Sequence, residues 1–321
     1  MKKALICGVS GQDGAYLAQF LLSRGYQVWG TSRDAQVANF SNLKALGIRE
    51  RVNVLSMAQT DFRSVLNSLA RAEPDEVYFL SGQSSVGLSF DQPAETMESV
   101  TLGVLNLLEA IRFFGKPIKV YHASSGECFG DVGQQSASED TPFRPRSPYG
   151  VAKASAHWLV TNYREAYGLF ACNGILFNHE SPLRPARFVT RKIISTACRI
   201  SQGEHETLSL GRLDIVRDWG CAHEYVESMW RMLQAELPDD YVIATGHSAA
   251  LSEFVSLAFS TLGLDWKEFV VSDPSLFRPL DITFSAGNPE KANRLLGWSA
   301  PTLLPELVSR LVSAELGQSG R

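Results

Sequence analysis

Residues 3–14 read KALICGVSGQDG, and this stretch decides the fold of the chain. A short apolar run with β-forming residues ends at Gly8, and a segment with helical spacing begins after Gly11. Gly8, Gly11 and Gly14 allow the backbone to turn tightly and to approach a pyrophosphate, which then lies at the N-terminus of the following helix. Three glycines at this spacing are a weak signal on their own. Their place between a predicted strand and a predicted helix favours a dinucleotide site.

The same rhythm continues along the first half of the chain. Apolar runs with β-forming residues alternate with longer segments of helical spacing, a pattern that predicts a parallel sheet flanked by helices. The runs cover residues 3–7, 27–31, 52–57, 76–80, 118–123 and 171–177. Between the first two, Leu17, Phe20 and Leu21 form one apolar stripe that can pack on the sheet. The predicted fold class is therefore α/β, with a Rossmann-type doubly wound parallel sheet.

The rhythm changes at about residue 178. Pro182 and Pro185 interrupt it, and two helices are predicted around residues 190–201 and 223–236, followed by mixed α+β structure. No repeat, low-complexity segment or linker separates the two parts, so we expect them to pack together. We predict a cofactor-binding domain over residues 1–177 and a smaller substrate-binding domain over residues 178–321, with some segments exchanged between them.

The composition is that of an ordinary globular protein. The chain has 321 residues, of which 45% are hydrophobic and 20% are charged, enough to bury a large core. Its net charge of -4 and its scattered cations argue against a nucleic-acid-binding surface. The apolar run after Lys3 is too short for a signal peptide or a membrane span, which predicts a cytoplasmic protein without membrane contact. The 5 cysteines contain no Cys-x-x-Cys pair, so neither disulfides nor a metal site is expected.

The end of the second predicted strand bears on the choice of cofactor. An acidic residue at this place would bind the ribose 2′-hydroxyl of NAD, but the sequence here is Thr31-Ser32-Arg33. Arg33 can pair with a 2′-phosphate, which favours NADP over NAD. Asp34 follows directly and would repel that phosphate, so NAD stays open as the weaker alternative.

Tyr149 and Lys153 stand four positions apart near the start of a helix predicted over residues 147–167, so both project from one face. A neighbouring ammonium group favours the phenolate and can make the tyrosine a base for a sugar hydroxyl. This pairing is common by chance and decides little alone. Ser125 adds weight, because it follows the fifth predicted strand and would place a hydroxyl in the crevice at the carboxyl ends of the strands. Short-chain dehydrogenases need these groups in this order.

Glu127 stands two positions beyond Ser125. A simple reductase needs no carboxylate there, whereas a base at this place could remove the proton α to a newly formed ketone. A single glutamate in a loop is otherwise most simply a solvated surface group. Glu127 is thus either a catalytic base that faces the active site or a solvated residue of a surface loop.

These residues resemble the GDP-mannose 4,6-dehydratase family, and the resemblance runs through nearly the whole chain. It rests on segments 8–14, 125–127, 145–153 (PRSPYGVAK), 177–182 (FNHESP), 188–192 (FVTRK), 217–220 (RDWG), 277–279 (FRP) and 296–298 (LGW). The segments NHESP and RDWG are particular to this family among extended short-chain enzymes. The resemblance implies conversion of GDP-mannose to GDP-4-keto-6-deoxy-mannose, with hydride passing internally from C4 to C6 and water lost.

The resemblance also implies roles for individual residues. The implied catalytic set is Ser125, Glu127, Tyr149 and Lys153. The implied cofactor residues are Gly8, Gly11, Gln12, Asp13, Gly14, Arg33, Ser84, Tyr149, Lys153, His179 and Arg184. The implied substrate residues are Ser85, Glu127, Asn178, Lys192, Arg217 and Arg278, whose cations would bind the diphosphate as charge-assisted donors. Family members are homo-oligomers, so a homodimer or homotetramer is expected. The face of the predicted helix at Val151, Ala154, Trp158 and Leu159 could supply a contact, although core packing would explain these apolar positions equally well.

Several positions depart from the family pattern. Gly126 replaces a serine, Ala58-Gln59 an adenine-side pair that begins with aspartate, Val216 a lysine, Arg212 an asparagine, and Ser85 a larger side chain beside the sugar. Three alternatives to GDP-mannose dehydration therefore stay open. They are a dehydratase of a modified mannose such as GDP-heptose, an epimerase or 4-keto reductase that does not need Glu127, and a cofactor-binding protein without activity.

Overall fold

Strand β1 (Lys3–Cys7) lies inside the main sheet of the computed structural model, which describes residues 1–319. The sheet has seven strands in the order β10-β6-β5-β4-β1-β2-β3, and every pairing is parallel. The other strands are β2 (Gln27–Ser32), β3 (Asn53–Ser56), β4 (Glu76–Phe79), β5 (Lys119–Ser125), β6 (Ala171–Leu176) and β10 (Asp240–Ile243). This order confirms the predicted doubly wound α/β sheet, whose direction of winding changes between β1 and β4. Sheets of this kind bind ligands in the crevice beyond the carboxyl ends of the strands at that point.

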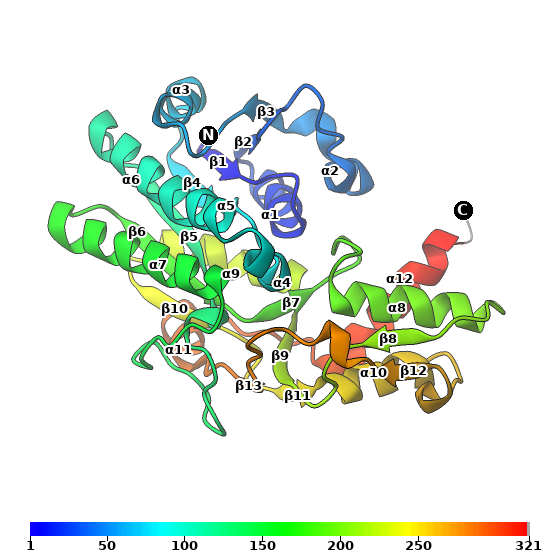
Figure 1. The fold of residues 1–321 in the computed structure, drawn as a ribbon. Coiled ribbons are helices and arrows are strands. Elements are labelled where there is room, and N and C mark those ends of the chain that lie inside the picture. Colours follow the sequence, from blue (N-terminus) through cyan, green and yellow to red (C-terminus); the bar gives the residue numbers. More distant parts are fainter. Residues whose placement is uncertain (320–321) are drawn as a thin grey trace.

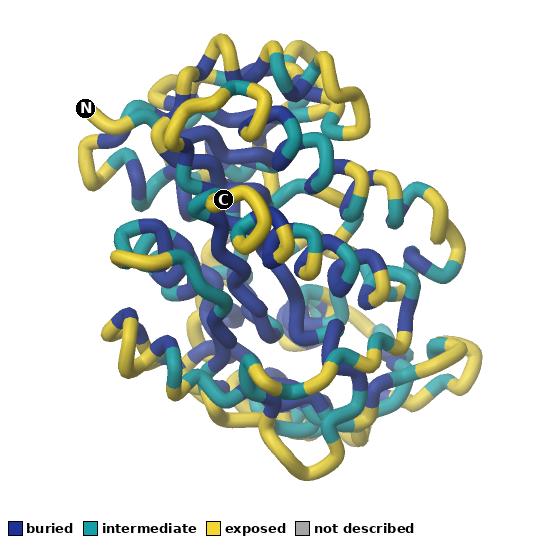
Figure 2. The backbone as a smooth tube through the Cα atoms, turned by 90° about the vertical axis from the view of Figure 1, so that its left-hand side faces the viewer, coloured by how far each residue is buried: buried dark blue, intermediate teal, exposed yellow. Residues whose placement is uncertain are grey.

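Helices cover both faces of the main sheet (Figure 1). The apolar side chains of one group join a core cluster on one face; this group is α1 (Gln12–Ser23), α9 (Ala222–Gln234) and α11 (Glu290–Leu296). A second group packs on the other face and consists of α3 (Phe62–Ala72), α6 (Gly103–Phe114) and α7 (Pro148–Tyr167). Shorter helical elements connect them: α2 (Ser41–Ala45), α4 (Val86–Asp91), α5 (Pro93–Met97), η1 (Arg49–Arg51), η2 (Glu98–Leu102) and η3 (Gly126–Cys128). The backbone of the sheet is accordingly buried in the centre of the molecule (Figure 2).

Helix α7 shows how local sequence sets the ends of an element. Pro148 occupies the first turn, where no backbone N–H is needed, and the Ser147 side chain accepts a hydrogen bond from the backbone N–H of Gly150 at 3.0 Å. The helix ends at Tyr167 and is capped by Gly168, whose φ of 67° lies in the left-handed region that glycine adopts freely. The helix predicted over residues 147–167 is thus confirmed to within one residue at its start.

The second half of the chain builds two smaller sheets beside the crevice. The larger one contains β11 (Ser248–Ala250), β9 (Val216–Cys221), β13 (Phe284–Ser285) and β7 (Asn178–Glu180), which pairs with β9. The smaller one pairs β12 (Val270–Ser272) with β8 (Leu208–Leu210). Around them lie α8 (Val189–Ser201), α10 (Leu251–Ser260), α12 (Leu304–Ser319), η4 (Trp266–Glu268) and η5 (Pro274–Leu276). Strand β10 and helix α9 come from this half of the chain but pack with the main sheet.

The cysteines, possible metal ligands and long helices of the described residues can now be compared with the sequence predictions. All five cysteines are free and buried: Cys7, Cys128, Cys172, Cys198 and Cys221. Over residues 1–319, no cluster of three or more His, Cys, Asp or Glu side chains is arranged to hold a metal ion. Within the same residues, we find no helix with the length and apolar character needed to cross a membrane.

Candidate active site

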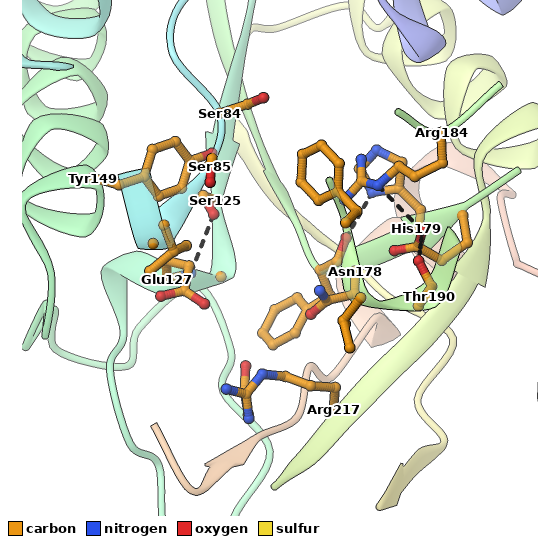
Figure 3. A pocket seen from close by; sticks show the side chains of 18 of the residues that line it. Ser84, Ser85, Ser125, Glu127, Tyr149, Asn178, His179, Arg184, Thr190 and Arg217 are labelled. Carbon is orange, nitrogen blue, oxygen red and sulfur yellow. Dashed lines mark hydrogen bonds and ion pairs between the residues drawn. The ribbon is translucent and has the colours of Figure 1, made fainter. Parts of the chain in front are cut away.

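A pocket of about 450 Å³ opens beyond the carboxyl ends of β4, β5 and β6, and residues from both halves of the chain line it. The predicted site residues that line it are Asp13, Ser84, Ser85, Ser125, Glu127, Tyr149, Lys153, Asn178, His179, Arg184, Lys192, Arg217 and Arg278. Figure 3 shows Tyr149, Ser125 and Glu127 on one side of this pocket and His179, Arg184 and Arg217 on the other. The remaining predicted residues, Gly8, Gly11, Gln12, Gly14 and Arg33, lie outside its lining.

Ser125 is the last residue of β5, two positions beyond the predicted end of this strand. Its hydroxyl accepts a hydrogen bond from the backbone N–H of Glu127 at 3.2 Å, which fixes the turn η3 behind it. The Ser125 hydroxyl also lowers the pKa of the Tyr149 phenol, against the larger, opposite effect of burial. Ser125 therefore links the tyrosine to the turn that carries Glu127.

Lys153 is buried and lies one helical turn beyond Tyr149 on α7. Its Nζ donates to the backbone carbonyl of Ala123 at 2.8 Å and lies 5.8 Å from the centre of the Tyr149 ring. Burial lowers the pKa of Lys153 to about 8 and raises that of Tyr149 above its ordinary value. The spacing predicts that Lys153 activates the phenol, but the largest contributions that lower the pKa of Tyr149 here come from Ser125 and Arg184. Lys153 is not among these largest contributions, and its hydrogen bond is made to the backbone near the end of β5 and not to the phenol.

Glu127 is partly exposed and lies in the pocket lining, so it is not a solvated loop residue. Its enclosure raises the pKa of the carboxyl group, while Arg217 and Arg278 oppose that rise and Asp281 adds to it. The glycine before it, Gly126, packs so closely on Phe177 that a Cβ atom there would lie 3.1 Å from the ring. The departure from serine at position 126 therefore fits the local packing.

The glycine motif forms a cradle at the N-terminus of α1. Gly8 has a φ of 87°, and its backbone N–H donates to the carbonyl of Thr31 at the end of β2. A Cβ atom on Gly14 would lie 2.3 Å from the Gly8 carbonyl oxygen, so only glycine lets the helix start this close to the loop. The turn brings unpaired backbone N–H groups and the positive end of the helix dipole toward one place, an arrangement that fits a dinucleotide pyrophosphate.

Gln12 and Asp13 tie this helix to strand β7. The Gln12 amide donates to the His179 carbonyl at 3.2 Å and accepts a hydrogen bond from the Ser181 hydroxyl at 2.7 Å. Asp13 Oδ2 lies 2.9 Å from His179 Nε2, while His179 Nδ1 lies 2.7 Å from the Phe177 carbonyl oxygen. Both ring nitrogens thus face acceptors, which requires that His179 carry two protons if Asp13 is ionised.

The pKa shifts agree with that charge pair. Burial alone would lower the pKa of His179, but the charge and hydrogen bond of Asp13 raise it above 6.5. Burial alone would raise the pKa of Asp13, but His179 lowers it to about 2. The positive imidazolium offsets a carboxylate that would otherwise oppose an anion at the start of α1.

Arg33 lies where β2 ends, with 87% of its side chain exposed and its Nη2 3.8 Å from Glu95 Oε1. Asp34 turns to its own loop, where its carboxylate accepts hydrogen bonds from the backbone N–H groups of Gln36 and Val37 at 2.9 and 3.4 Å. Because the Asp34 carboxylate is hydrogen-bonded within its own loop, it would repel a phosphate beside Arg33 less strongly. Gln59, at the predicted adenine side, donates its amide to the Ser99 carbonyl at 2.7 Å.

The predicted substrate residues surround the rest of the pocket. Lys192 Nζ donates to the Ser209 carbonyl at 2.7 Å, and Arg217 is buried with only one of its guanidinium nitrogens bonded, to the Val216 carbonyl at 2.8 Å, among residues 1–319. Ser85 is held by Gln83, whose side chain donates to the Ser85 carbonyl at 2.8 Å. This hydrogen bond holds the backbone of the segment at Ser85 in place beside the pocket.

Among the residues that sequence reasoning missed are Glu180, Arg187 and Thr190, which line the pocket, and Asp281, which pairs with two of the lining arginines. Glu180 is buried, accepts a hydrogen bond from Thr190 Oγ1 at 2.6 Å and lies 3.2 Å from Arg184 Nε. Asp281 lies near Arg217 and Arg278. Only the spacing of Asp281 three positions after Arg278 could have indicated it beforehand.

Similarity to known proteins extends over nearly the whole chain. The family model described as GDP-mannose 4,6 dehydratase matches residues 5–311. The chain is 45% identical over 325 residues to GDP-mannose 4,6 dehydratase 2 of Arabidopsis thaliana, covering 98% of this chain and 87% of the relative. It is 42% identical over 349 residues to GDP-mannose 4,6-dehydratase of Vibrio cholerae, covering 98% and 94%. Among solved structures, UDP-glucose 4-epimerase of Thermus thermophilus in complex with NAD matches with a TM-score of 0.86 and 26% identity, over 99% of each chain.

Proposed function

The chain belongs to the GDP-mannose 4,6 dehydratase family, and we propose that it removes water from GDP-mannose with Ser125, Glu127, Tyr149 and Lys153 as its catalytic residues. It is accordingly a hydro-lyase acting on a nucleotide sugar, GDP-mannose. The roles below follow from the positions of these side chains in one pocket.

A nicotinamide dinucleotide fits the cradle at the start of α1. Gly8, Gly11 and Gly14 allow the close approach of a pyrophosphate, and the His179–Asp13 pair lies in the pocket beside it. NADP is the preferred form in this proposal, because Arg33 is exposed at the end of β2 and Asp34 is engaged with its own loop. The cofactor, when bound, takes up a hydride from C4 and returns it at C6, so the reaction needs no outside reductant.

Oxidation at C4 requires a base and a place for the hydroxyl oxygen. Tyr149 as phenolate removes the proton of the C4 hydroxyl while that carbon becomes a ketone. The Ser125 hydroxyl favours the ionised form of the same phenol, and Lys153 places positive charge near the ring. These three residues alone would serve a simple dehydrogenase.

Elimination requires the carboxylate. The 4-ketone acidifies C5–H, and Glu127 removes this proton and passes it to the C6 hydroxyl, which leaves as water. C5 then takes up one proton, and Tyr149 releases the proton that it took from the C4 hydroxyl. The protons therefore balance, and both side chains return to their starting states. The carboxyl pKa, raised by enclosure, suits a group that must accept and then release a proton.

The observation that carries this function is the position of Glu127 in the same pocket as Tyr149 and Lys153, with its backbone bonded to Ser125. The test incubates the purified protein with GDP-mannose and no reductant, and measures the product by mass spectrometry. We expect loss of one water. An isomer of unchanged mass would indicate an epimerase, and a protein that binds the cofactor but converts no GDP-sugar would indicate an inactive site.

A second substrate belongs in the same experiment. Ser85 and its neighbours Ser84, Val86 and Gly87 line the pocket with small side chains, which leaves room for a further carbon at C6. GDP-heptose is therefore compared with GDP-mannose at equal concentrations. Faster dehydration of GDP-heptose would extend the substrate class to modified mannoses.

Assembly and location complete the proposal. Val151 and Trp158 on α7 are 43% and 59% exposed, which suits a contact with a second copy of the chain in a homodimer or homotetramer. The other two positions of the predicted face differ, because Ala154 is buried and Leu159 packs against the core. The five unpaired buried thiols suit a reducing compartment, so we propose that the enzyme works in the cytoplasm. Light scattering of the purified protein measures the mass of the oligomer in solution. A Trp158→Glu variant with the same mass as wild type would argue against the α7 contact.

A further inference from the structure

Three charged side chains line one wall of the pocket, and a fourth, Asp281, pairs with two of them. Glu127 comes from η3, Arg217 from β9, and Arg278 and Asp281 from the segment before β13. Asp281 Oδ1 lies 3.9 Å from Arg217 Nη2 and 3.6 Å from Arg278 Nη1. One carboxylate is therefore shared by the two guanidinium groups that the sequence assigns to the diphosphate of the substrate.

The backbone fixes Asp281 in this place. Two residues further on, Thr283 donates both its backbone N–H and its hydroxyl to Asp131, and its carbonyl accepts the backbone N–H of Val216 at 2.8 Å. Strand β13 then continues beside β9, with Phe284 opposite Val216. Asp281 is thus held close to Arg217, and the same anchors join this segment to the loop that follows Glu127.

The hydrogen-bonding capacity of the shared pair is only partly used. Over residues 1–319, Arg217 Nη2 and Asp281 Oδ1 are both buried and neither has a hydrogen-bond partner. Arg217 is only 4% exposed, and its side chain extends into the pocket on the side facing Glu127 (Figure 3). A buried cation beside the proposed C5 base Glu127 would, without a counter-charge, hold that carboxylate as an ion pair.

We propose that Asp281 is a positioning residue for the reaction: its carboxylate shares the charge of Arg217 and Arg278, so that neither guanidinium group neutralises the base Glu127. This inference rests on the proposed dehydratase function, because only elimination needs Glu127. When a diphosphate pairs with the two arginines, the same carboxylate keeps Glu127 in surroundings that favour proton uptake. The pocket can then use two cations for binding without weakening the base beside them.

The charges around Glu127 support this division of roles. Enclosure raises the pKa of Glu127, Arg217 and Arg278 lower it, and Asp281 raises it. The other titratable groups facing Glu127 are Tyr149 on α7 and the neighbouring thiol of Cys128, and the charge of Glu127 raises the pKa of both. Removing the negative charge at position 281 should therefore lower the pKa of Glu127.

The test measures the ionisation of Glu127 directly in the enzyme with bound NADP. The infrared carbonyl band of protonated Glu127 is identified as the band that Glu127→Gln lacks, and its loss is followed against pH. In Asp281→Asn we expect the midpoint to fall by about 0.5–1 pH unit relative to wild type, in line with loss of a nearby charge. Asp281→Glu keeps the charge and should restore the midpoint, while retained NADP affinity in both variants reports an intact fold.

Turnover provides the second measurement. The acid limb of kcat for GDP-mannose dehydration should move to lower pH by the same amount in Asp281→Asn, because the base stays ionised to lower pH, and Asp281→Glu should retain the wild-type limb. Equal midpoints in wild type and Asp281→Asn would overturn the role of Asp281. If wild type fails to dehydrate GDP-mannose while the infrared midpoints still shift, the proposed function fails and the charge relation between Asp281 and Glu127 stands.

Discussion

Replacing Glu127 by glutamine separates oxidation of the sugar from elimination of water. The variant keeps the size of the side chain and the backbone bond from Glu127 N–H to Ser125 at 3.2 Å, and it removes only the base. Loss of a general base costs about two to four orders of magnitude in rate, or roughly 3–5 kcal/mol of transition-state stabilisation. We expect product formation from GDP-mannose to fall by that factor.

The structure also predicts the stability of this variant. The folded pKa of Glu127 is raised, so the contribution of this group to stability is present below its unfolded pKa and is lost as the pH rises through the folded value. At neutral pH the ionised carboxylate therefore costs stability, and glutamine removes that cost. The melting temperature of Glu127→Gln at about pH 7.5, above the ordinary range of a carboxyl pKa, should equal or exceed that of wild type, which excludes misfolding as the reason for lost activity.

Three measurements on the variant test the reasoning. Mass spectrometry follows the dehydrated product, heavy-water labelling follows exchange at C5, and near-ultraviolet absorbance follows a nicotinamide left in its reduced form. In Glu127→Gln we expect no exchange at C5 and a stalled signal of the reduced nicotinamide. In the control Tyr149→Phe we expect no exchange at C5 and no reduced signal. Turnover of Glu127→Gln close to the wild-type rate would refute the elimination mechanism.

Three further predictions concern the cofactor site. Gly14→Ala places a Cβ atom 2.3 Å from the Gly8 carbonyl oxygen, so cofactor affinity measured by calorimetry should fall at least tenfold; an unchanged affinity would show that the loop can move freely. Arg33→Ala should weaken NADP binding by roughly 1–3 kcal/mol and leave NAD binding nearly unchanged, and an equal loss for both would remove Arg33 from the 2′-phosphate. The raised pKa of His179 means that the stabilisation from its pair with Asp13 is complete below pH 6.5 and is lost as the pH rises through the folded value, so cofactor affinity should decline over that alkaline range. Asp13→Asn should remove this pH dependence, and an unchanged profile in that variant would contradict the charged pair.

The main sheet could be predicted because its strands are continuous apolar runs with a regular spacing of helices between them. Strand β5 shows the limit of that signal: Ser124 and Ser125 extend it as polar residues, and only pairing with Ile175 and Leu176 on β6 identifies them as strand. Strand β10 is four residues long and comes from the second half of the chain, so nothing in its local pattern indicates that it closes the edge of the sheet beside β6. Long-range pairing decides both cases.

The candidate site divides in the same way. Glycines at a strand-to-helix turn and a tyrosine four positions before a lysine have local spacing, so sequence indicates them. The pairing of Asp13 with His179 joins residues 166 positions apart, and Asp281 reaches Arg217 only because a strand of two residues pairs with β9. Charge pairs of this kind depend on how the two halves of the chain meet, which no local period records.

The shifts at Tyr149 and Lys153 indicate why the two halves must meet before the chemistry can begin. Burial raises the pKa of the phenol and lowers that of the lysine to about 8, so enclosure by itself makes the tyrosine a weaker acid and leaves the lysine easier to deprotonate. Ser125 and Arg184 oppose the effect on the phenol, and Arg184 belongs to the second half of the chain. Arg184 thus adds positive charge from outside α7 to that of Lys153, and an oxidised nicotinamide ring, when bound in the pocket, would add more and favour the phenolate further. It follows that the protein should remove the C4 proton only after the cofactor is bound, which keeps an unpaired base out of the empty pocket.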